Sequence, residues 1–201
     1  MCGRFGFTMP RKQAEEVFGL VHSDEFEPRP NIAPTTPVLG IVPSDEGLVG
    51  RLFLWGLVPS WSKDPKMGSR LINARGETVA EKASFRTAFK RRRCLVPATC
   101  FYEWRKEESG KQPYSFHLRD TQPFAMAGIW EFWEGHEGAF TSLAIITTEA
   151  NELVADIHQR MPVILPPSEY TFWLNPASPA QSLQQLIKPY AGKDLAATPM
   201  D

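Results

Sequence analysis

The residue with the clearest chemical potential stands second in the chain, in the segment Met1-Cys2-Gly3-Arg4-Phe5. Methionine is usually removed when a small side chain follows it, and Cys2 would then carry a free α-amine and a thiol on one carbon. Such a 1,2-aminothiol condenses with an aldehyde through the amine, and the sulfur then closes a five-membered thiazolidine ring. A useful fraction of both nucleophiles exists near neutral pH. The sequence therefore predicts aldehyde chemistry at Cys2, with an incidental cysteine as the alternative.

A carboxylate enclosed by aromatic side chains is a candidate for proton transfer. Glu103 lies in the segment Phe101-Tyr102-Glu103-Trp104. Desolvation in such surroundings raises the pKa of a glutamate toward the range of a general acid and base. The alternative is that strand alternation turns Glu103 toward water while its neighbours pack.

Two further segments place polar groups beside apolar residues. Asn73 and Arg75 follow the pair Leu71-Ile72, where an amide and a guanidinium are unexpected. His158 and Arg160 come before Pro162, near which a helix must end, and element boundaries are usual places for functional groups. A capping histidine and a surface arginine are the alternatives.

Other chemical motifs are weak or missing. The histidines and cysteines lack the spacing of a zinc site, so no metal is expected, and no glycine-rich motif predicts a nucleotide or another cofactor. The turn between Trp55 and Trp61 could instead stack two tryptophans on unpaired bases, although tryptophan is more often a core residue. A basic cluster at Arg86 and 90–93 predicts either a local nucleic-acid groove or a solvated helix end.

The composition is that of an ordinary globular chain. At 201 residues with 42% hydrophobic residues it can bury a sizeable core, and its net charge of -1 argues against coating nucleic acid through bulk positive potential. Three cysteines, no signal-like start and no apolar run of about 18 residues favour a cytoplasmic protein without a membrane span. We expect a monomer.

The pattern of apolar and turn residues predicts one α+β domain over residues 1–201. Thr8 is expected to cap a helix that Gly19 ends, and a hairpin is expected to join 38–42 to 48–55. Strands at 114–118, 124–130 and 139–147 are expected to form a meander. Helices are expected at 77–92 and 149–157.

Six segments, in this order, resemble the motifs of the SRAP family, whose bacterial members are abasic site processing proteins. The segments are Met1-Cys2-Gly3-Arg4-Phe5, Asn31-Ile32-Ala33-Pro34, Trp55-Gly56-Leu57-Val58-Pro59-Ser60-Trp61, Asn73-Ala74-Arg75-Gly76-Glu77-Thr78, Cys94-Leu95-Val96-Pro97 with Phe101-Tyr102-Glu103-Trp104, and His158-Gln159-Arg160-Met161-Pro162. The similarity runs to about Leu165. It implies a strand-rich α+β domain with mixed and antiparallel, barrel-like sheets and a few helices.

The resemblance also implies a reaction. Family members attack the aldehyde of an abasic site in single-stranded DNA and remain attached as a thiazolidine crosslink, which shields the lesion. By position, Cys2 is the nucleophile, Asn73 orients the N-terminus or the sugar oxygen, Glu103 shuttles protons, and His158 protonates the sugar. Lyase-type Schiff base chemistry, autoproteolytic activity and association with the nucleoid when crosslinked follow from the same resemblance.

DNA contacts are implied in the same way. Arg4, Arg75 and Arg160 would hold phosphates, since a planar guanidinium fork suits phosphate geometry. Pro34 and the turn from Trp55 to Trp61 would shape the path of the strand and its junction with duplex.

Two departures from the family pattern and two other classes of function remain. The sequence reads Thr198-Pro199-Met200-Asp201 at its end, whereas relatives usually continue through a short segment that contains Val-Asn. Many relatives read Ala-Asp-Gly where this chain has Ala98-Thr99-Cys100, so a turn that favours glycine must be made otherwise. Cys2 could act as the nucleophile of an amidohydrolase with its own α-amine as base. The chain could also be a non-catalytic module that binds single-stranded DNA.

Overall fold

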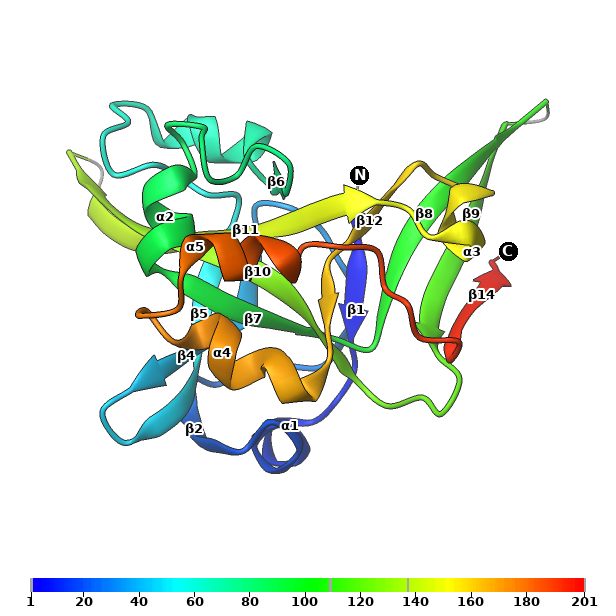
Figure 1. Ribbon diagram of the computed structural model, residues 1–201, viewed down its shortest axis with the longest axis horizontal. Coiled ribbons are helices and arrows are strands. Elements are labelled where there is room, and N and C mark those ends of the chain that lie inside the picture. The colour runs from blue at the N-terminus through cyan, green and yellow to red at the C-terminus, as the bar shows by residue number, and fades with distance from the viewer. Residues whose placement is uncertain (1, 109, 137, 201) are drawn as a thin grey trace.

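The most apolar runs of the chain form a closed five-stranded barrel in the computed structural model, which describes residues 2–108, 110–136 and 138–200 (Figure 1). Around the barrel the strands are β4 (Pro37–Ser44), β5 (Gly47–Trp55), β11 (Gly138–Glu149), β10 (Phe124–Gly135) and β7 (Arg93–Ala98), which returns to β4. Neighbouring strands are antiparallel except β5 and β11, which close the barrel in parallel where Leu54 and Trp55 lie beside Ser142 and Leu143.

Short strands and helices surround the barrel. The additional strands on this sheet are β2 (Leu20–Ser23), β6 (Asn73–Arg75), β12 (Arg160–Pro162) and β13 (Ile164–Leu165). The helices are α1 (Arg11–Phe18), α2 (Arg86–Arg91), α3 (Glu152–Ala155), α4 (Tyr170–Leu174) and α5 (Ala180–Gln185), with 3-10 turns η1 (Pro65–Arg70) and η2 (Pro167–Glu169). In the described part of the chain, no helix has the length and apolar composition needed to cross a membrane.

Helix α4 covers the outer face of β7. The Trp173 indole N–H donates to the Cys94 carbonyl over 3.0 Å, and the Arg93 guanidinium donates to the Trp173 carbonyl over 2.6 Å. Arg93 is 3% exposed and also donates to carbonyls at the end of α2. This member of the basic cluster therefore holds the structure together and is not part of a nucleic-acid groove.

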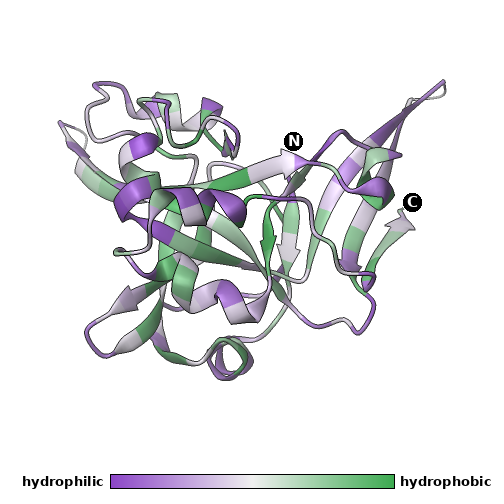
Figure 2. Ribbon diagram, in the orientation of Figure 1, coloured by the Kyte–Doolittle hydropathy of each residue, from purple (hydrophilic) through white to green (hydrophobic). Residues whose placement is uncertain are grey.

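A second, antiparallel sheet packs beside the barrel. Its strand order is β14 (Leu195–Pro199), β9 (Gly110–Leu118), β8 (Cys100–Glu107), β1 (Phe5–Phe7) and β3 (Arg29–Ile32). Phe101 stacks on Phe116 at a centroid distance of 4.8 Å and meets the edge of Phe124 from the barrel at 6.4 Å. These rings join the two sheets, and Figure 2 shows hydrophobic residues concentrated in the strands and hydrophilic residues toward the outer end of the β8–β9 hairpin.

The structure confirms the strand-rich α+β fold and several local predictions. The hairpin forms as β4 and β5, and the remaining strands form with longer bounds as β9, β10 and β11. Helix α1 ends at Gly19, whose φ of 62° is the left-handed conformation that glycine favours. The cap at its start is Pro10, so the prediction of Thr8 as the cap is wrong.

The predicted meander is wrong, because β9 pairs with β8 and β14 while β10 pairs with β11 and β7. The helix predicted over 77–92 is reduced to α2, since tertiary contacts hold the residues that precede it. The Gly76 N–H, for example, donates to the Thr147 carbonyl of β11 over 2.8 Å. The second predicted helix shortens to α3, which Asn151 caps by accepting from the Val154 N–H.

Candidate active site and nucleic-acid interface

The N-terminal segment lies against β8. Phe5 of β1 pairs with Phe101, and the ladder continues where the Tyr102 N–H donates to the Arg4 carbonyl over 2.9 Å. The extended chain before Phe5 thus brings Cys2 into the space between the two sheets, where its side chain is fully buried. Pairing with a central strand therefore fixes the position of the candidate nucleophile.

Glu103 points into the protein from β8. It is two residues beyond Phe101 and therefore shares the inward face, and only 3% of Glu103 is exposed. The outward alternative is wrong, because that face of β8 packs against the barrel. Burial raises the pKa of the Glu103 carboxyl, and the nearby His158 opposes this rise.

The turn that leads into β8 forms without glycine. Among the described non-glycine residues, positive φ occurs at Thr35 and Thr121, so Cys100 adopts no left-handed conformation. Thr99 closes the turn instead, because both its N–H and its hydroxyl donate to the Gly6 carbonyl, over 2.8 and 3.1 Å. The departure at Ala98-Thr99-Cys100 therefore leaves the direction of Glu103 intact.

Asn73 holds the N-terminal segment from the opposite side. It begins β6, which runs parallel to β11, and its Nδ2 donates to the Cys2 carbonyl over 2.8 Å. Its Oδ1 is buried and has no hydrogen-bond partner among the described residues. A buried acceptor without a partner is costly, so this oxygen is suited to a donor from a ligand or from a new N-terminal amine.

His158 completes the group from the link between α3 and β12. Its Nδ1 lies 3.9 Å from Glu103 Oε1 and accepts from the Arg160 N–H over 3.0 Å. The imidazole is about one-third exposed, whereas the carboxylate beside it is buried. Proton transfer between the interior and solvent is therefore possible through this pair.

The structure thus gathers all four predicted catalytic residues between the sheets. The thiol of Cys2 donates to the Arg4 carbonyl at 3.8 Å, and its pKa is raised by burial and then by the charge of Glu103. The thiol is therefore protonated at neutral pH and needs a base to become a nucleophile. Within the described ranges, no three His, Cys, Asp or Glu side chains are grouped as metal ligands.

Arg160 has a different surrounding from the one predicted. Its guanidinium donates to both carboxylate oxygens of Glu77 and to the Thr147 carbonyl over 2.8 Å. Its side chain is 18% exposed, so in this structure it joins the chain after β6 to β12 and does not present a free fork to a phosphate. Glu77 is not among the predicted site residues. Its place in the same family motif as Asn73 and Arg75 is the sequence feature that could have indicated a role.

The other predicted phosphate contacts lie nearer the surface. Arg75 is exposed, and Arg4 is half-buried with its Nη1 donating to Asn31 Oδ1 over 3.0 Å. Pro34 is also half-buried and precedes Thr35, whose φ of 63° is unusual for a β-branched residue. These positions are compatible with a strand that passes the N-terminal segment.

The two predicted tryptophans differ. Trp61 is 58% exposed and can present a ring to a base. Trp55 is fully buried, its Nε1 donates to the Ile72 carbonyl over 3.0 Å, and its ring meets Phe5 edge-on. The prediction of Trp55 as a DNA contact is therefore wrong, because packing under β1 leaves no ring surface for stacking.

Comparison with known proteins identifies relatives over nearly the whole chain. The model of the family described as SOS response associated peptidase (SRAP) matches residues 1–201. The abasic site processing protein YoaM of Bacillus subtilis is 40% identical over 98% of this chain and 89% of its own length. The abasic site processing protein YedK of Escherichia coli is 34% identical over 87% of this chain and 79% of its own length.

Solved structures agree with these sequence matches. A crystal structure of a protein from Bacteroides thetaiotaomicron superposes with a TM-score of 0.92 at 28% identity, covering 100% of this chain and 92% of the other. One from Bordetella bronchiseptica has a TM-score of 0.87 at 26% identity and covers each chain fully. With the family model, the relatives and the shared fold in agreement, this chain belongs to the SOS response associated peptidase (SRAP) family.

Proposed function

We propose that the protein processes abasic sites in single-stranded DNA by forming a covalent thiazolidine crosslink through Cys2. The crosslink shields the lesion from strand cleavage, and abasic DNA is both substrate and partner. The names of the relatives, abasic site processing proteins from Bacillus subtilis and Escherichia coli, support this substrate.

The observation that carries the proposal is the hydrogen bond from Asn73 to the Cys2 carbonyl. It fixes the backbone of the second residue beside a buried carboxylate and a histidine that reaches solvent. A residue held this way presents an amine and a thiol in one geometry once Met1 has been removed. Such positioning favours a two-bond attack on a single carbon.

The reaction proceeds in two bond-forming steps. The Cys2 amine attacks the aldehyde carbon of the ring-opened deoxyribose, and the carbonyl oxygen leaves as water, giving an imine. The sulfur then adds to the imine carbon while the thiol proton passes to nitrogen, which closes the ring. His158 protonates the sugar oxygen during ring opening, and Glu103 carries protons between amine, departing oxygen and thiol.

The electrostatics of the site support these roles. Burial raises the pKa of the Glu103 carboxyl, and this direction of shift favours its use as a proton shuttle. Burial raises the pKa of the thiol, which favours the amine as the first nucleophile. Asn73 Oδ1 accepts a hydrogen bond from that amine or from a sugar hydroxyl.

The test compares mature protein with protein that carries a tag before Cys2, each mixed with single-stranded DNA bearing one abasic site. The mature protein should give an adduct that survives denaturation, and the tagged protein should not, because its α-amine is an amide. An equally efficient adduct from both proteins would refute the use of the Cys2 amine.

The same samples distinguish the other classes of function. An amidohydrolase would cleave a general amide substrate, and a binding module would give only a reversible shift with intact and abasic DNA alike. The denaturation-resistant adduct is expected only from a self-crosslinking protein.

A further inference from the structure

The outer half of the β8–β9 hairpin extends beyond the sheet that supports its base. On the β8 side, β1 reaches only to Tyr102. On the β9 side, β14 pairs as far as Tyr114, after which the Met200 N–H donates to the Pro113 carbonyl and Gln112 Nε2 donates to the Met200 carbonyl. The pairs from Arg105 to Glu107 therefore form a two-stranded ribbon, which projects away from the barrel in Figure 1. Such a ribbon has little core of its own, so its side chains are available for contacts.

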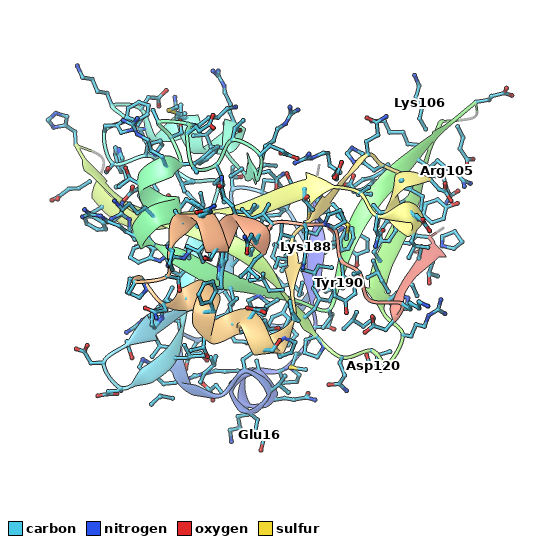
Figure 3. All side chains as sticks on the ribbon, viewed as in Figure 1. Glu16, Arg105, Lys106, Asp120, Lys188 and Tyr190 are labelled. Atoms are coloured by element: carbon cyan, nitrogen blue, oxygen red, sulfur yellow. The ribbon has the colours of Figure 1, made fainter. Side chains whose placement is uncertain are left out.

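The two faces of this ribbon differ in charge. On one face Arg105 is neutralised, because its guanidinium donates to Glu107 over 2.6 Å and lies 5.0 Å from the centre of the Tyr114 ring. On the other face, strand alternation places Trp104 and Lys106, and the register puts Lys111 directly opposite Lys106. Figure 3 labels Arg105 and Lys106 on this projecting part.

The lysine pair is unfavourable for the hairpin alone. Like charges directly opposite on antiparallel strands repel each other. Across the described residues, neither lysine takes part in an ion pair that would offset this repulsion. Trp104, the next residue inward on the same face, is 37% exposed. Two uncompensated cations beside an exposed indole are complementary to a chain of phosphates and bases.

The same face continues toward the candidate active site. Arg4, whose carbonyl accepts from the Tyr102 N–H, stands beside the inner end of this row and two residues from Cys2. On this face, Lys106 lies four positions beyond Tyr102, a distance of about 13 Å at the usual rise per residue. The row is therefore continuous with the surface where a bound strand would enter or leave the site.

We propose that Trp104, Lys106 and Lys111 form a binding surface for the sugar-phosphate backbone of the DNA that flanks the lesion. We call this surface the hairpin face. The proposal rests on the proposed function, because the ligand of the hairpin face is the same DNA strand that carries the lesion. In the complex, bound phosphates lie near Lys106 and Lys111 and offset the repulsion between these two side chains.

The test measures the salt dependence of binding to an intact single-stranded oligonucleotide. The Lys106→Gln/Lys111→Gln variant should lower the slope of log K against log salt by about 1.4, since each phosphate contact on a single strand contributes about 0.7. The matched control is Lys12→Gln/Lys193→Gln, which removes the same charge from exposed lysines elsewhere and should keep the parental slope. If both variants kept the parental slope, the proposal that the hairpin face binds DNA would be wrong.

A second variant separates binding from folding. Lys106→Glu places opposite charges across the hairpin, so it should raise Tm slightly while it weakens DNA binding. If instead it weakened binding only together with a lower Tm, the lysines would be structural and the proposal would be wrong.

Failure of the proposed function gives a different pattern. If the parent bound intact DNA through the lysines but formed no adduct with abasic DNA, the hairpin face would stand and the crosslinking chemistry would fall. If the lysines bound vesicles of phosphatidylglycerol and not DNA, the hairpin face would belong to a membrane contact and the proposal would be refuted.

Discussion

β8 passes from the protein interior to solvent within a few residues, and its two parts serve different ends. Glu103 is 3% exposed and has a raised pKa, whereas its neighbour Trp104 is 37% exposed and shares a face with Lys106 and Lys111, which lie opposite each other. Proton transfer needs a desolvated group, while contact with a phosphate chain needs accessible charge. One strand can position both kinds of group, because alternation sends adjacent side chains to opposite faces.

The largest effect on the reaction with abasic DNA is expected from substitution of Cys2 in the buried site. Cys2→Ser keeps the α-amine, so an imine can form, but the hydroxyl closes the ring poorly. The imine acidifies the adjacent proton and permits β-elimination, so the variant should nick abasic DNA and be trapped by borohydride, while the thiazolidine is lost. A gel assay with and without borohydride measures this.

The control for Cys2→Ser is binding of intact DNA, which should remain parental. A folded, DNA-binding variant that neither nicks nor is trapped would indicate that the thiol, not the amine, attacks first.

The next effect is expected at Glu103. Glu103→Gln keeps the shape but cannot exchange a proton, so the rate of adduct formation should fall by about 10² to 10⁴. Because the folded pKa of Glu103 is raised, the parent loses stability as pH rises from the unfolded pKa through the folded one. Glu103→Gln has no carboxyl to ionise at this position and does not lose this stability, so its Tm at pH 7 should exceed that of the parent.

Glu107→Gln is the matched control for Glu103→Gln, since it lies on the same strand and face but forms an exposed pair with Arg105. It should crosslink at the parental rate. A parental rate in Glu103→Gln as well would remove Glu103 from the mechanism.

A smaller effect is expected at the exposed Trp61. Trp61→Ala removes an exposed ring, and stacking contributes about 1–3 kcal/mol per base, so affinity for single-stranded DNA should fall about 5- to 150-fold. Tm should remain unchanged. Phe132→Ala, which removes another exposed ring, is the control and should bind as the parent does. Equal affinities for all three proteins would show that Trp61 makes no stacking contact.

The smallest effect is expected on the free energy of unfolding, from weakening the ion pair between Glu77 and Arg160 near the buried site. Glu77→Gln weakens the bonds to Arg160, and hydrogen bonds to charged groups contribute about 1.5–3 kcal/mol, reduced here because Glu77 is half exposed. We expect a loss of about 1 kcal/mol of unfolding free energy at pH 7, measured by denaturant titration.

The contribution of Glu77 to the free energy of unfolding should depend on pH. Arg160 lowers the pKa of Glu77, so the parent's extra stability is present above the unfolded pKa and is lost as pH falls through the folded one. The two curves should therefore converge in acid. Glu16→Gln, on the exposed face of α1, should follow the parent throughout, and a Glu77→Gln curve identical to the parent's would contradict the role of the pair.

The sequence determined the elements whose signals are local. The alternating and apolar runs that became β4, β5, β10 and β11 were predictable, as was the glycine that ends α1. The sequence also singles out Cys2 as a candidate nucleophile, because an aminothiol needs no neighbour to react with an aldehyde. The ordered motifs predicted the family that the comparisons support.

The direction in which side chains point, and the groups they contact, depend on how the sheets pack together. Glu103 points inward because β8 packs on the barrel, and Trp55 is fully buried with the Phe5 ring of β1 packed edge-on against it. The bond from Asn73 to Cys2 joins residues 71 positions apart, and the pair of Arg160 with Glu77 spans 83. Residue patterns report periodicity along the chain, whereas burial and pairing depend on partners that distant strands supply, so these features appear only when the two sheets come together.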